Sequence, residues 1–232
     1  MPLAILGFLA VFAWRFADER LYSDSGYYLA RVINEGSFRI EHGRWVLALS
    51  QVLALIGVKL GLGMKSLIVL HSLNNVAWLG ACTLVAKRVL HDDRAVLLLA
   101  CVHVIGLTHG LFCPIFELYY GVDLLILFNA TRQAEHLRPA VRWILLIVFF
   151  VGAISSHFFA LLLAAGVLLL VRVWKDRPMT LALGSATVVV LAVRMATLSV
   201  YEQSGLEFLR DLGDPVKVFA LFAPARIAEL IG

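Results

Sequence analysis

The sequence is poor in charged residues, which make up 16% of its 232 positions, against roughly a quarter in soluble domains. Apolar residues take their place, because 61% of the chain is hydrophobic and the mean hydropathy is +0.89. This shortage of charge excludes an ordinary soluble domain and predicts an integral membrane protein whose first partner is the lipid bilayer. The net charge of +4 is modest and the basic residues lie mainly in loops, so nothing indicates nucleic-acid binding.

The chain also lacks the short motifs of several enzyme classes. It contains no GxxxxGK[ST], no GxGxxG after a strand and no HExxH, so nucleotide-driven transport, Rossmann chemistry and zincin chemistry have no support. Its three cysteines, Cys82, Cys101 and Cys113, show no CxxC spacing and fall in or beside apolar runs. They are predicted to be buried small hydrophobic residues.

The sequence does have a series of apolar runs of helical length, separated by short basic clusters. This pattern predicts an all-α fold, a polytopic transmembrane helical bundle of about seven spans. The runs cover residues 2–16, 66–86, 95–112, 118–131, 140–155, 158–173 and 180–199.

The basic clusters predict the topology of the bundle. KRVLHDDR, TRQAEHLRPAVR and RVWKDRP alternate with turns that carry no Lys or Arg, which places the three clusters and the N-terminus in the cytoplasm. The run 45–61 decides the number of spans and the side of Asp24. If this run spans the membrane, there are eight spans and Asp24 lies inside. If it lies in the interface, there are seven spans and Asp24 lies outside. We favour seven, with an outer loop 17–65 inside a membrane domain 1–200, and an outer-side C-terminal segment 201–232.

The stretch SDSGYYLARVINEGSF, residues 23–38, departs from the pattern of a membrane core. Ser23 as N-cap, Asp24 in the first turn and Gly36 as left-handed C-cap predict a helix of three turns. Polar residues recur at i, i+3, i+4 and i+7, so the helix is amphipathic and presents one carboxylate at the membrane surface. Its polar side holds Asp24, Tyr27, Tyr28 and Arg31, and its apolar side holds Leu29, Val32 and Ile33.

Polar side chains inside the predicted spans gather in their outer halves. A charge in hydrocarbon costs several kcal/mol unless it faces a cavity or a partner, so this grouping predicts a water-filled pocket on the side of Asp24. The alternative is that each group simply bonds to a neighbouring helix. The residues are His71, Asn74, Asn75, His109, Asp123 and Arg194, with Glu117 and His157 at outer turns.

These features together resemble the GT-C glycosyltransferases, polytopic enzymes that take sugars from polyprenyl-phosphate carriers. The resemblance covers nearly the whole chain in architecture and a short part of it in motif. It departs from many members where Ser25, and not Glu, follows Asp24. The matching residues are Asp24-Ser25-Gly26-Tyr27-Tyr28-Leu29-Ala30-Arg31, Gly36-Ser37-Phe38 and Glu41-His42-Gly43-Arg44-Trp45.

The resemblance implies a membrane glycosyltransferase that uses a polyprenyl-phosphate sugar at the periplasmic face of a bacterial inner membrane. A lipid-phosphate donor is expected, and a divalent metal is left open. Asp24 would be the catalytic base that takes the proton of an acceptor hydroxyl, and Glu117 a second catalytic acid. The residues expected to bind the substrate are Arg44, His71, His157, Arg194, Tyr27 and Tyr28.

Three other classes remain open. Family members usually continue well past the seventh span, which favours a non-catalytic GT-C-derived subunit that assembles with other membrane proteins. A transporter has little support, because no internal repeat is evident. A haem or metal protein would use His71, His103, His109 and His157, although His103 and His109 do not share a helix face.

Overall fold

A computed structural model describes residues 2–22, 24–106, 113–197 and 203. Every regular element in these ranges is a helix and none of them contains a strand, which confirms the predicted all-α fold. The chain divides into two compact units, residues 1–191 and 192–232. The first unit contains all the helices except the last residues of α11.

The helix bounds follow the predicted apolar runs closely. Residues 107–112, the end of the predicted run 95–112, lie outside the described residues. The first half of the chain forms α1 (Pro2–Arg15), the 3-10 turn η1 (Glu19–Leu21), α2 (Asp24–Glu35), α3 (Leu47–Ser50), α4 (Val52–Lys59), α5 (Met64–Leu84) and the π turn η2 (Val85–Val89). The second half forms α6 (Asp93–Ile105), α8 (Glu117–Gln133), α9 (Pro139–Ile154), α10 (Phe158–Leu170), the 3-10 turn η3 (Val173–Lys175) and α11 (Arg177–Ala196).

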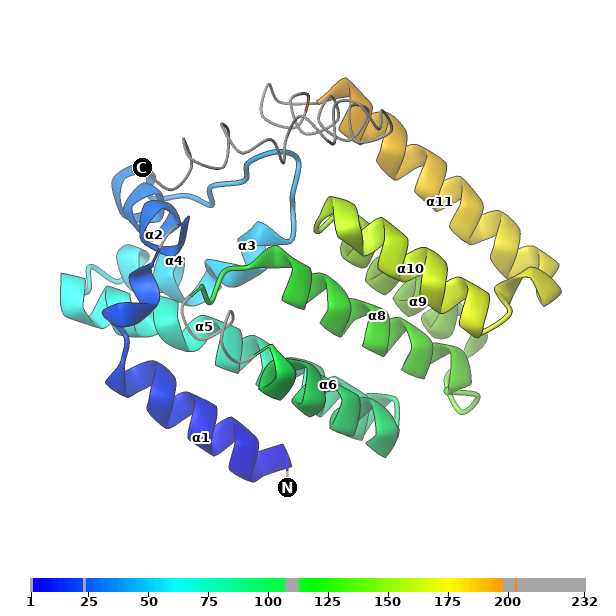
Figure 1. The fold of residues 1–232 in the computed structure, drawn as a ribbon, viewed down its shortest axis with the longest axis horizontal. Helices are drawn as coiled ribbons and strands as arrows, with labels where there is room; N and C mark the ends of the chain where they lie inside the picture. Colours follow the sequence, from blue (N-terminus) through cyan, green and yellow to red (C-terminus); the bar gives the residue numbers. More distant parts are fainter. Residues whose placement is uncertain (1, 23, 107–112, 198–202, 204–232) are drawn as a thin grey trace, which may run out of the picture. The chain divides into compact units, whose positions relative to one another are not determined.

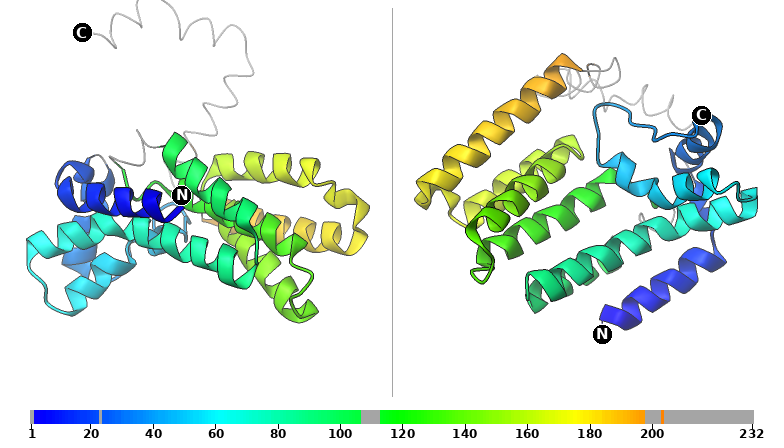
Figure 2. Two further views of the ribbon diagram at one scale, coloured as in Figure 1. Left: turned by 90° about the horizontal axis from the view of Figure 1, so that it is seen from below. Right: turned by 180° about the vertical axis from the view of Figure 1, so that it is seen from behind.

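The longer helices pack in sequence, α1 on α5, α5 on α6, α6 on α8, α8 on α9 and α9 on α10 (Figures 1 and 2). Two apolar clusters hold them together. One surrounds Leu99 and Leu127 between α1, α5, α6 and α8, and the other surrounds Phe128 and Phe150 between α8, α9 and α10. Because α8 contributes to both clusters, it joins the two halves of this unit.

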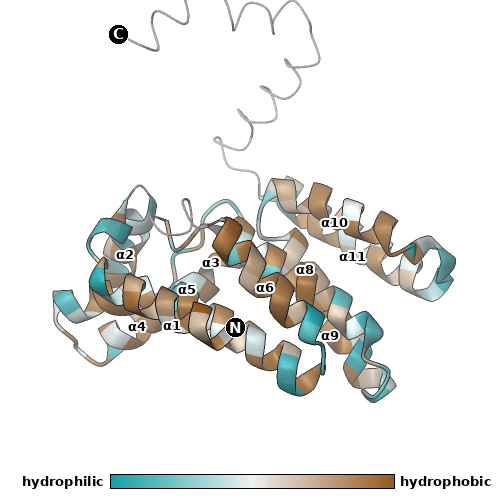
Figure 3. Cartoon of the chain, turned by 60° about the horizontal axis from the view of Figure 1, so that its bottom comes forward, coloured by the Kyte–Doolittle hydropathy of each residue, from teal (hydrophilic) through white to brown (hydrophobic). Residues whose placement is uncertain are grey.

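The helices are hydrophobic along their bodies and hydrophilic mainly at their ends and turns (Figure 3). Two described helices, Met64–Val89 and Arg177–Ala196, are long and apolar enough to cross a membrane by length and composition. Their most apolar windows are 28% and 17% buried, whereas the core helix of a soluble protein is mostly buried. Helices α1, α9 and α10 are apolar but shorter than a full span, so the predicted number of seven spans is not confirmed.

The three basic clusters meet at one end of the helices. His136 forms a hydrogen bond of 2.9 Å with the backbone oxygen of Val89, and Arg132 donates to the backbone oxygen of Val171 at 3.4 Å. These contacts connect clusters that are far apart in sequence, as the predicted alternation of turns requires. We call residues 85–94, 131–142 and 171–177 the basic end.

The turns without Lys or Arg meet on the other side. The rings of Phe116 and His157 lie 6.0 Å apart, and Arg44 in the loop after α2 forms an ion pair with Glu117 at the start of α8. The first long loop therefore lies at the same end as these turns. We call residues 16–65, 113–117 and 155–157 the α2 end.

Residues 45–61 form two short helices and no continuous span. The helix is interrupted at Gln51. There the Asn74 side chain on α5 accepts a hydrogen bond from the Leu53 amide at 2.9 Å and donates one to the Leu49 carbonyl at 2.7 Å. These bonds satisfy backbone groups that the break leaves without helical partners. Helices of 4 and 8 residues rise about 6 and 12 Å, too little for a hydrocarbon core of about 30 Å. Neither helix alone is therefore long enough to span, so the structure does not confirm the eight-span alternative.

Candidate functional site

Helix α2 presents the candidate base. It begins at Asp24 and ends at Glu35, and Gly36 follows with a φ of +61°, as predicted for a left-handed C-cap. Ser23, the predicted N-cap, lies outside the described residues. Asp24 is exposed, and its carboxylate forms no hydrogen bond or ion pair with the part of the chain that the structure describes. The carboxylate is therefore accessible to a ligand.

The other side of α2 is buried and fixes the position of Asp24. Ser25 is completely buried, and its hydroxyl lies 3.0 Å from Nε2 of His71 on α5. His71 is itself buried, so it supports α2 from beneath and does not reach the exposed side. The apolar residues of this contact are Leu29, Val32, Ala54 and Leu67.

Glu41 clamps the following loop onto α2. One of its carboxylate oxygens accepts from Tyr27 at 2.6 Å and from Arg39 Nε at 3.0 Å, and the other accepts from Tyr28 at 3.4 Å. Burial alone would raise the pKa of Glu41, but the hydrogen bonds from Tyr27 and Arg39 hold that pKa below its ordinary value. The backbone of Arg39 also exchanges two hydrogen bonds with the Gln51 side chain. These hydrogen bonds therefore fix the loop both to α2 and to Gln51, the residue between α3 and α4.

Arg44, in the same loop, forms its ion pair with Glu117 in a largely buried place, since the two side chains are 18% and 8% exposed. Tyr28 lies beside this pair. Burial raises the pKa of Tyr28, the charges of Glu41, Glu117 and Asp24 act in the same direction, and Arg44 opposes them. The structure therefore brings together five of the predicted site residues: Asp24, Tyr27, Tyr28, Arg44 and Glu117.

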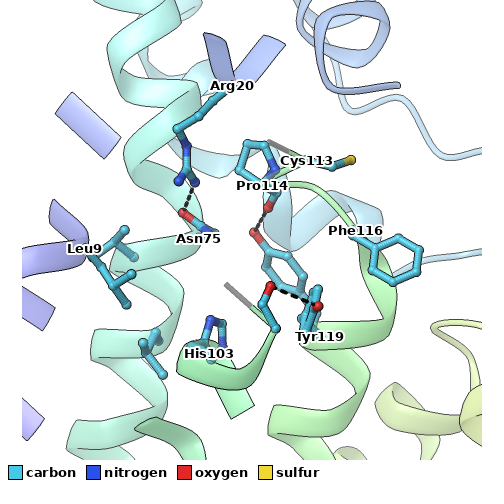
Figure 4. Close-up of a pocket in the computed structure, with 12 residues that line it drawn as sticks. Leu9, Arg20, Asn75, His103, Cys113, Pro114, Phe116 and Tyr119 are labelled. Atoms are coloured by element: carbon cyan, nitrogen blue, oxygen red, sulfur yellow. Dashed lines mark hydrogen bonds between the residues drawn. The ribbon is translucent and has the colours of Figure 1, made fainter. Parts of the chain in front are cut away.

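Arg20, in η1, is a buried cation that the sequence analysis did not select. It is 2% exposed, and its Nη2 donates to Asn75 Oδ1 at 2.8 Å (Figure 4). The same nitrogen donates to the Ser72 carbonyl at 3.3 Å. No carboxylate of the described ranges pairs with it, and its Nε has no acceptor there. Burial lowers the pKa of Arg20 to about 10. A buried cation without a counter-ion is costly, which points to an anion as the missing partner.

Arg20 borders a pocket between α1, α5, α6 and the start of α8 (Figure 4). The cavity volume of the pocket is about 20 Å³, enough for a water molecule. It resembles the predicted outer-half pocket, but its lining is different. Asn75 is the one predicted residue among the described residues that line it. The polar residues around it are Arg20, Asn75, His103, Tyr119 and Tyr120.

Cys113 connects this pocket with the exposed carboxylate. Its side chain lines the pocket (Figure 4). The pKa of the Cys113 thiol is raised to about 11, mainly by burial and also by the charges of Asp24 and Glu117, while the charge of Arg20 acts in the opposite direction. Asp24, Glu117 and Arg20 therefore all lie within electrostatic reach of one thiol. The carboxylate and the buried cation belong to one region of the protein.

Asp123 lies deeper among the helices and is engaged there. It is fully buried, accepts from Trp78 Nε1 at 3.0 Å and pairs with His103 Nε2 at 3.0 Å. Its partners come from α5 and α6. Asp123 therefore bonds to neighbouring helices, as the alternative to a pocket position predicted, and it does not line the pocket.

The remaining predicted residues lie elsewhere. His157 is the N-cap of α10, where its Nδ1 accepts from the Phe159 amide at 3.1 Å. Arg194 belongs to the second compact unit, so it is not placed in this site. His109 falls within 107–112, outside the described residues.

The histidines of the metal alternative are engaged separately, since His71 meets Ser25, His103 meets Asp123, and His157 caps a helix. In the described ranges, no three His, Cys, Asp or Glu side chains gather as metal ligands.

Sequence analysis missed Arg20 and Glu41 as members of the site. Glu41 stands in the stretch that carries the family resemblance, three positions before Arg44, and this spacing is its only signal. Arg20 stands among both signs of charge in ADERLYS, where no pattern separates a buried cation from an exposed one.

Among the described residues, the arrangement offers an exposed proton acceptor, Asp24, on a helix that packs against η1, and in η1 a buried cation, Arg20, that has no acid partner there. Comparison of the chain with protein families, curated proteins and solved structures gives no match.

Proposed function

We propose that this protein is an integral-membrane glycosyltransferase that uses a polyprenyl-phosphate-linked sugar as donor. One observation carries the proposal: an exposed carboxylate, Asp24, starts a helix that packs against η1, and η1 holds the buried guanidinium of Arg20, which has no acid partner among the described residues. Transfer of a sugar from a lipid phosphate needs a base for the acceptor and a cation for the phosphate. The α2 end supplies both.

The two residues have separate roles in the transfer. Asp24 takes the proton from the acceptor hydroxyl as the hydroxyl oxygen forms a bond to the anomeric carbon. The bond between that carbon and the phosphate oxygen breaks, and its electron pair leaves with the lipid phosphate. Arg20 stabilises the negative charge that develops on this leaving group.

The ion pair of Arg44 and Glu117 gives these two residues positioning roles. Because Glu117 is held by Arg44, it is a weaker candidate for a second acid than its place in the sequence implies. The pair ties the loop after α2 to the start of α8. It thereby sets the distance between the Asp24 helix and the pocket that Arg20 borders.

The membrane setting follows from charge and hydropathy. The two candidate spans, Met64–Val89 and Arg177–Ala196, and the gathering of the basic clusters at one end favour a cytoplasmic basic end and N-terminus. The α2 end then faces the outer side of a bacterial inner membrane. A lipid-borne donor suits that side, because it needs no nucleotide there.

The decisive experiment compares Asp24→Asn with Asp18→Asn, an exposed acid of the same loop. The purified full chain is supplied with polyprenyl-phosphate sugars, and release of the polyprenyl phosphate is followed with a membrane extract as acceptor. Loss of a general base typically costs ~10²- to 10⁴-fold in rate, so Asp24→Asn should lose that much and Asp18→Asn almost nothing. Full activity in Asp24→Asn would remove Asp24 as the base.

A second arm tests the anion site without catalysis. Polyprenyl phosphate should raise the melting temperature of the wild-type protein, because a ligand at 100 times its Kd stabilises by about 2.7 kcal/mol. Arg20→Met should lose this shift, and Arg31→Met, a control on the exposed side of α2, should keep it. If the wild type neither binds nor consumes any lipid-linked sugar, the non-catalytic subunit becomes the better interpretation.

A further inference from the structure

An apolar groove runs along α8 between α6 and α10, away from the pocket of Arg20. Its cavity volume is about 280 Å³. Its floor extends along α8 from Val122 to Asn129, about 10 Å at 1.5 Å per residue. Its walls include Leu98 and Leu163, which are 50% and 43% exposed. An exposed channel of this kind fits a hydrocarbon chain.

The groove ends at a cation. Asn129 and Val171 line its last part, and the Arg132 guanidinium lies between them, donating to Asn129 Oδ1 and to the Val171 carbonyl at 3.4 Å each. Both acceptors are neutral and both bonds are long. The Nε of Arg132 has no acceptor among the described residues. The Arg132 guanidinium, whose two hydrogen-bond acceptors are neutral and line the groove, therefore stands beside the end of an apolar channel.

The surroundings of Arg132 are positive. The basic end contains nine Lys or Arg against four Asp or Glu. Burial lowers the pKa of Arg132, the charge of Asp176 opposes this shift, and the charge of Arg142 lowers the pKa further. Asp176 also accepts a hydrogen bond from the Met179 amide at the start of α11. The neighbouring Arg172 has a φ of +54°, a conformation in which glycine would be less strained. The turn therefore keeps a cation where local geometry favours another residue.

We propose that this groove binds an anionic phospholipid, with one acyl chain along α8 between α6 and α10 and the phosphate at Arg132. The juxtaposition of an apolar channel and a guanidinium with neutral hydrogen-bond acceptors matches an amphiphile with a negative head group. This inference needs membrane integration but does not depend on glycosyl transfer. It concerns the end of the molecule opposite the proposed catalytic site.

The test measures which lipids stay on the protein. The full chain is reconstituted in bilayers of equal phosphatidylglycerol and phosphatidylcholine, and the lipids that remain bound are counted by native mass spectrometry. Because a basic residue near an anionic lipid is worth about a factor of five in affinity, the wild type should retain phosphatidylglycerol about fivefold over phosphatidylcholine. Arg132→Gln should reduce this ratio to near one.

Matched variants separate the site from general surface charge. Arg138→Gln removes an exposed cation of the same end and should leave the ratio unchanged. Arg132→Lys keeps the charge and should retain most of the preference, which controls for folding. Leu163→Trp fills the groove and should lower retention of both lipids severalfold. Leu162→Trp, at the adjacent exposed position outside the groove, should not.

Three results would overturn the proposal. The first is equal retention of the two lipids, or of neither, by the wild type. The second is an equal loss of preference in Arg138→Gln and Arg132→Gln, which would mean a diffuse surface effect. The third is a change of oligomeric state in Leu163→Trp with lipid retention unchanged, which would make the groove a protein interface.

Discussion

The two ends of the helices handle charge in opposite ways. The basic end carries nine Lys or Arg against four acids, and its ion pair between Lys87 and Asp93 is 56% and 75% exposed. The α2 end carries six of each sign. There the pair of Arg44 and Glu117 is largely buried, and Arg20 is buried without an acid partner among the described residues.

This difference separates two uses of charge. Exposed, unbalanced charge contributes little to any single contact, but in a membrane protein it orients the chain and attracts anionic head groups. Buried, nearly balanced charge at the α2 end determines geometry, because each partner is costly to leave alone. A site for chemistry is therefore expected at the α2 end and a surface for lipids at the basic end.

The largest expected effect is all-or-none and concerns which side of the membrane each end faces. In a background without the three native cysteines, Ser37→Cys should react with an impermeant thiol reagent in intact cells. Glu135→Cys, at an exposed position of the basic end, should react only after the cells are opened. Labelling of Glu135→Cys alone would invert the comparison and place Asp24 in the cytoplasm.

The next effect is on stability at the α2 end. Arg44→Met leaves the Glu117 carboxylate buried without its partner and should lower the free energy of unfolding by about 3 kcal/mol. Because replacing both charges removes the unpaired group, Arg44→Met with Glu117→Leu should recover most of that loss. Denaturation in detergent measures the coupling. A coupling near zero would mean that the pair does not tie the loop to α8.

The same contrast explains what the sequence could and could not predict. Helix bounds, the all-α fold and the meeting of the basic clusters follow from apolar runs and charge in contiguous segments, so they were predictable. The helix ending at Gly36 was also predictable, because capping is local. The exposed Asp24 belongs to the same class of inference.

The failures involve contacts between distant residues. The break at Gln51 depends on Asn74, and the partner of Arg44 lies 73 positions away. A single sequence contains no signal that shows which distant residues are in contact. Arg20 is buried because η1 turns back over α5, and the sequence shows only one more cation in a charged loop. Likewise His71 was predicted to face a substrate, but the contact with Ser25 places it beneath the helix.

A smaller effect should appear at acid pH, again at the α2 end. The pKa of folded Glu41 lies below its ordinary value of 4.5, so its bonds stabilise the loop above that pH and are lost as the pH falls through the folded pKa. Hydrogen exchange of residues 37–46, corrected for intrinsic pH dependence, should rise at pH values below 4.5. In Tyr27→Phe the rise should begin at higher pH. Residues 85–90, which contain no acid, should show no such rise.

The smallest effect is expected at the basic end, and it completes the comparison. The ion pair of Lys87 and Asp93 is exposed on both sides, and exposed pairs typically contribute less than about 1 kcal/mol because water screens them. Lys87→Met, Asp93→Asn and their combination should therefore each change the free energy of unfolding by about 0.5 kcal/mol or less, with almost no coupling. Added salt should reduce even this amount. A coupling as large as that of Arg44 and Glu117 would show that the basic end, too, uses paired charge to hold its turns together, and the division between the two ends would fail.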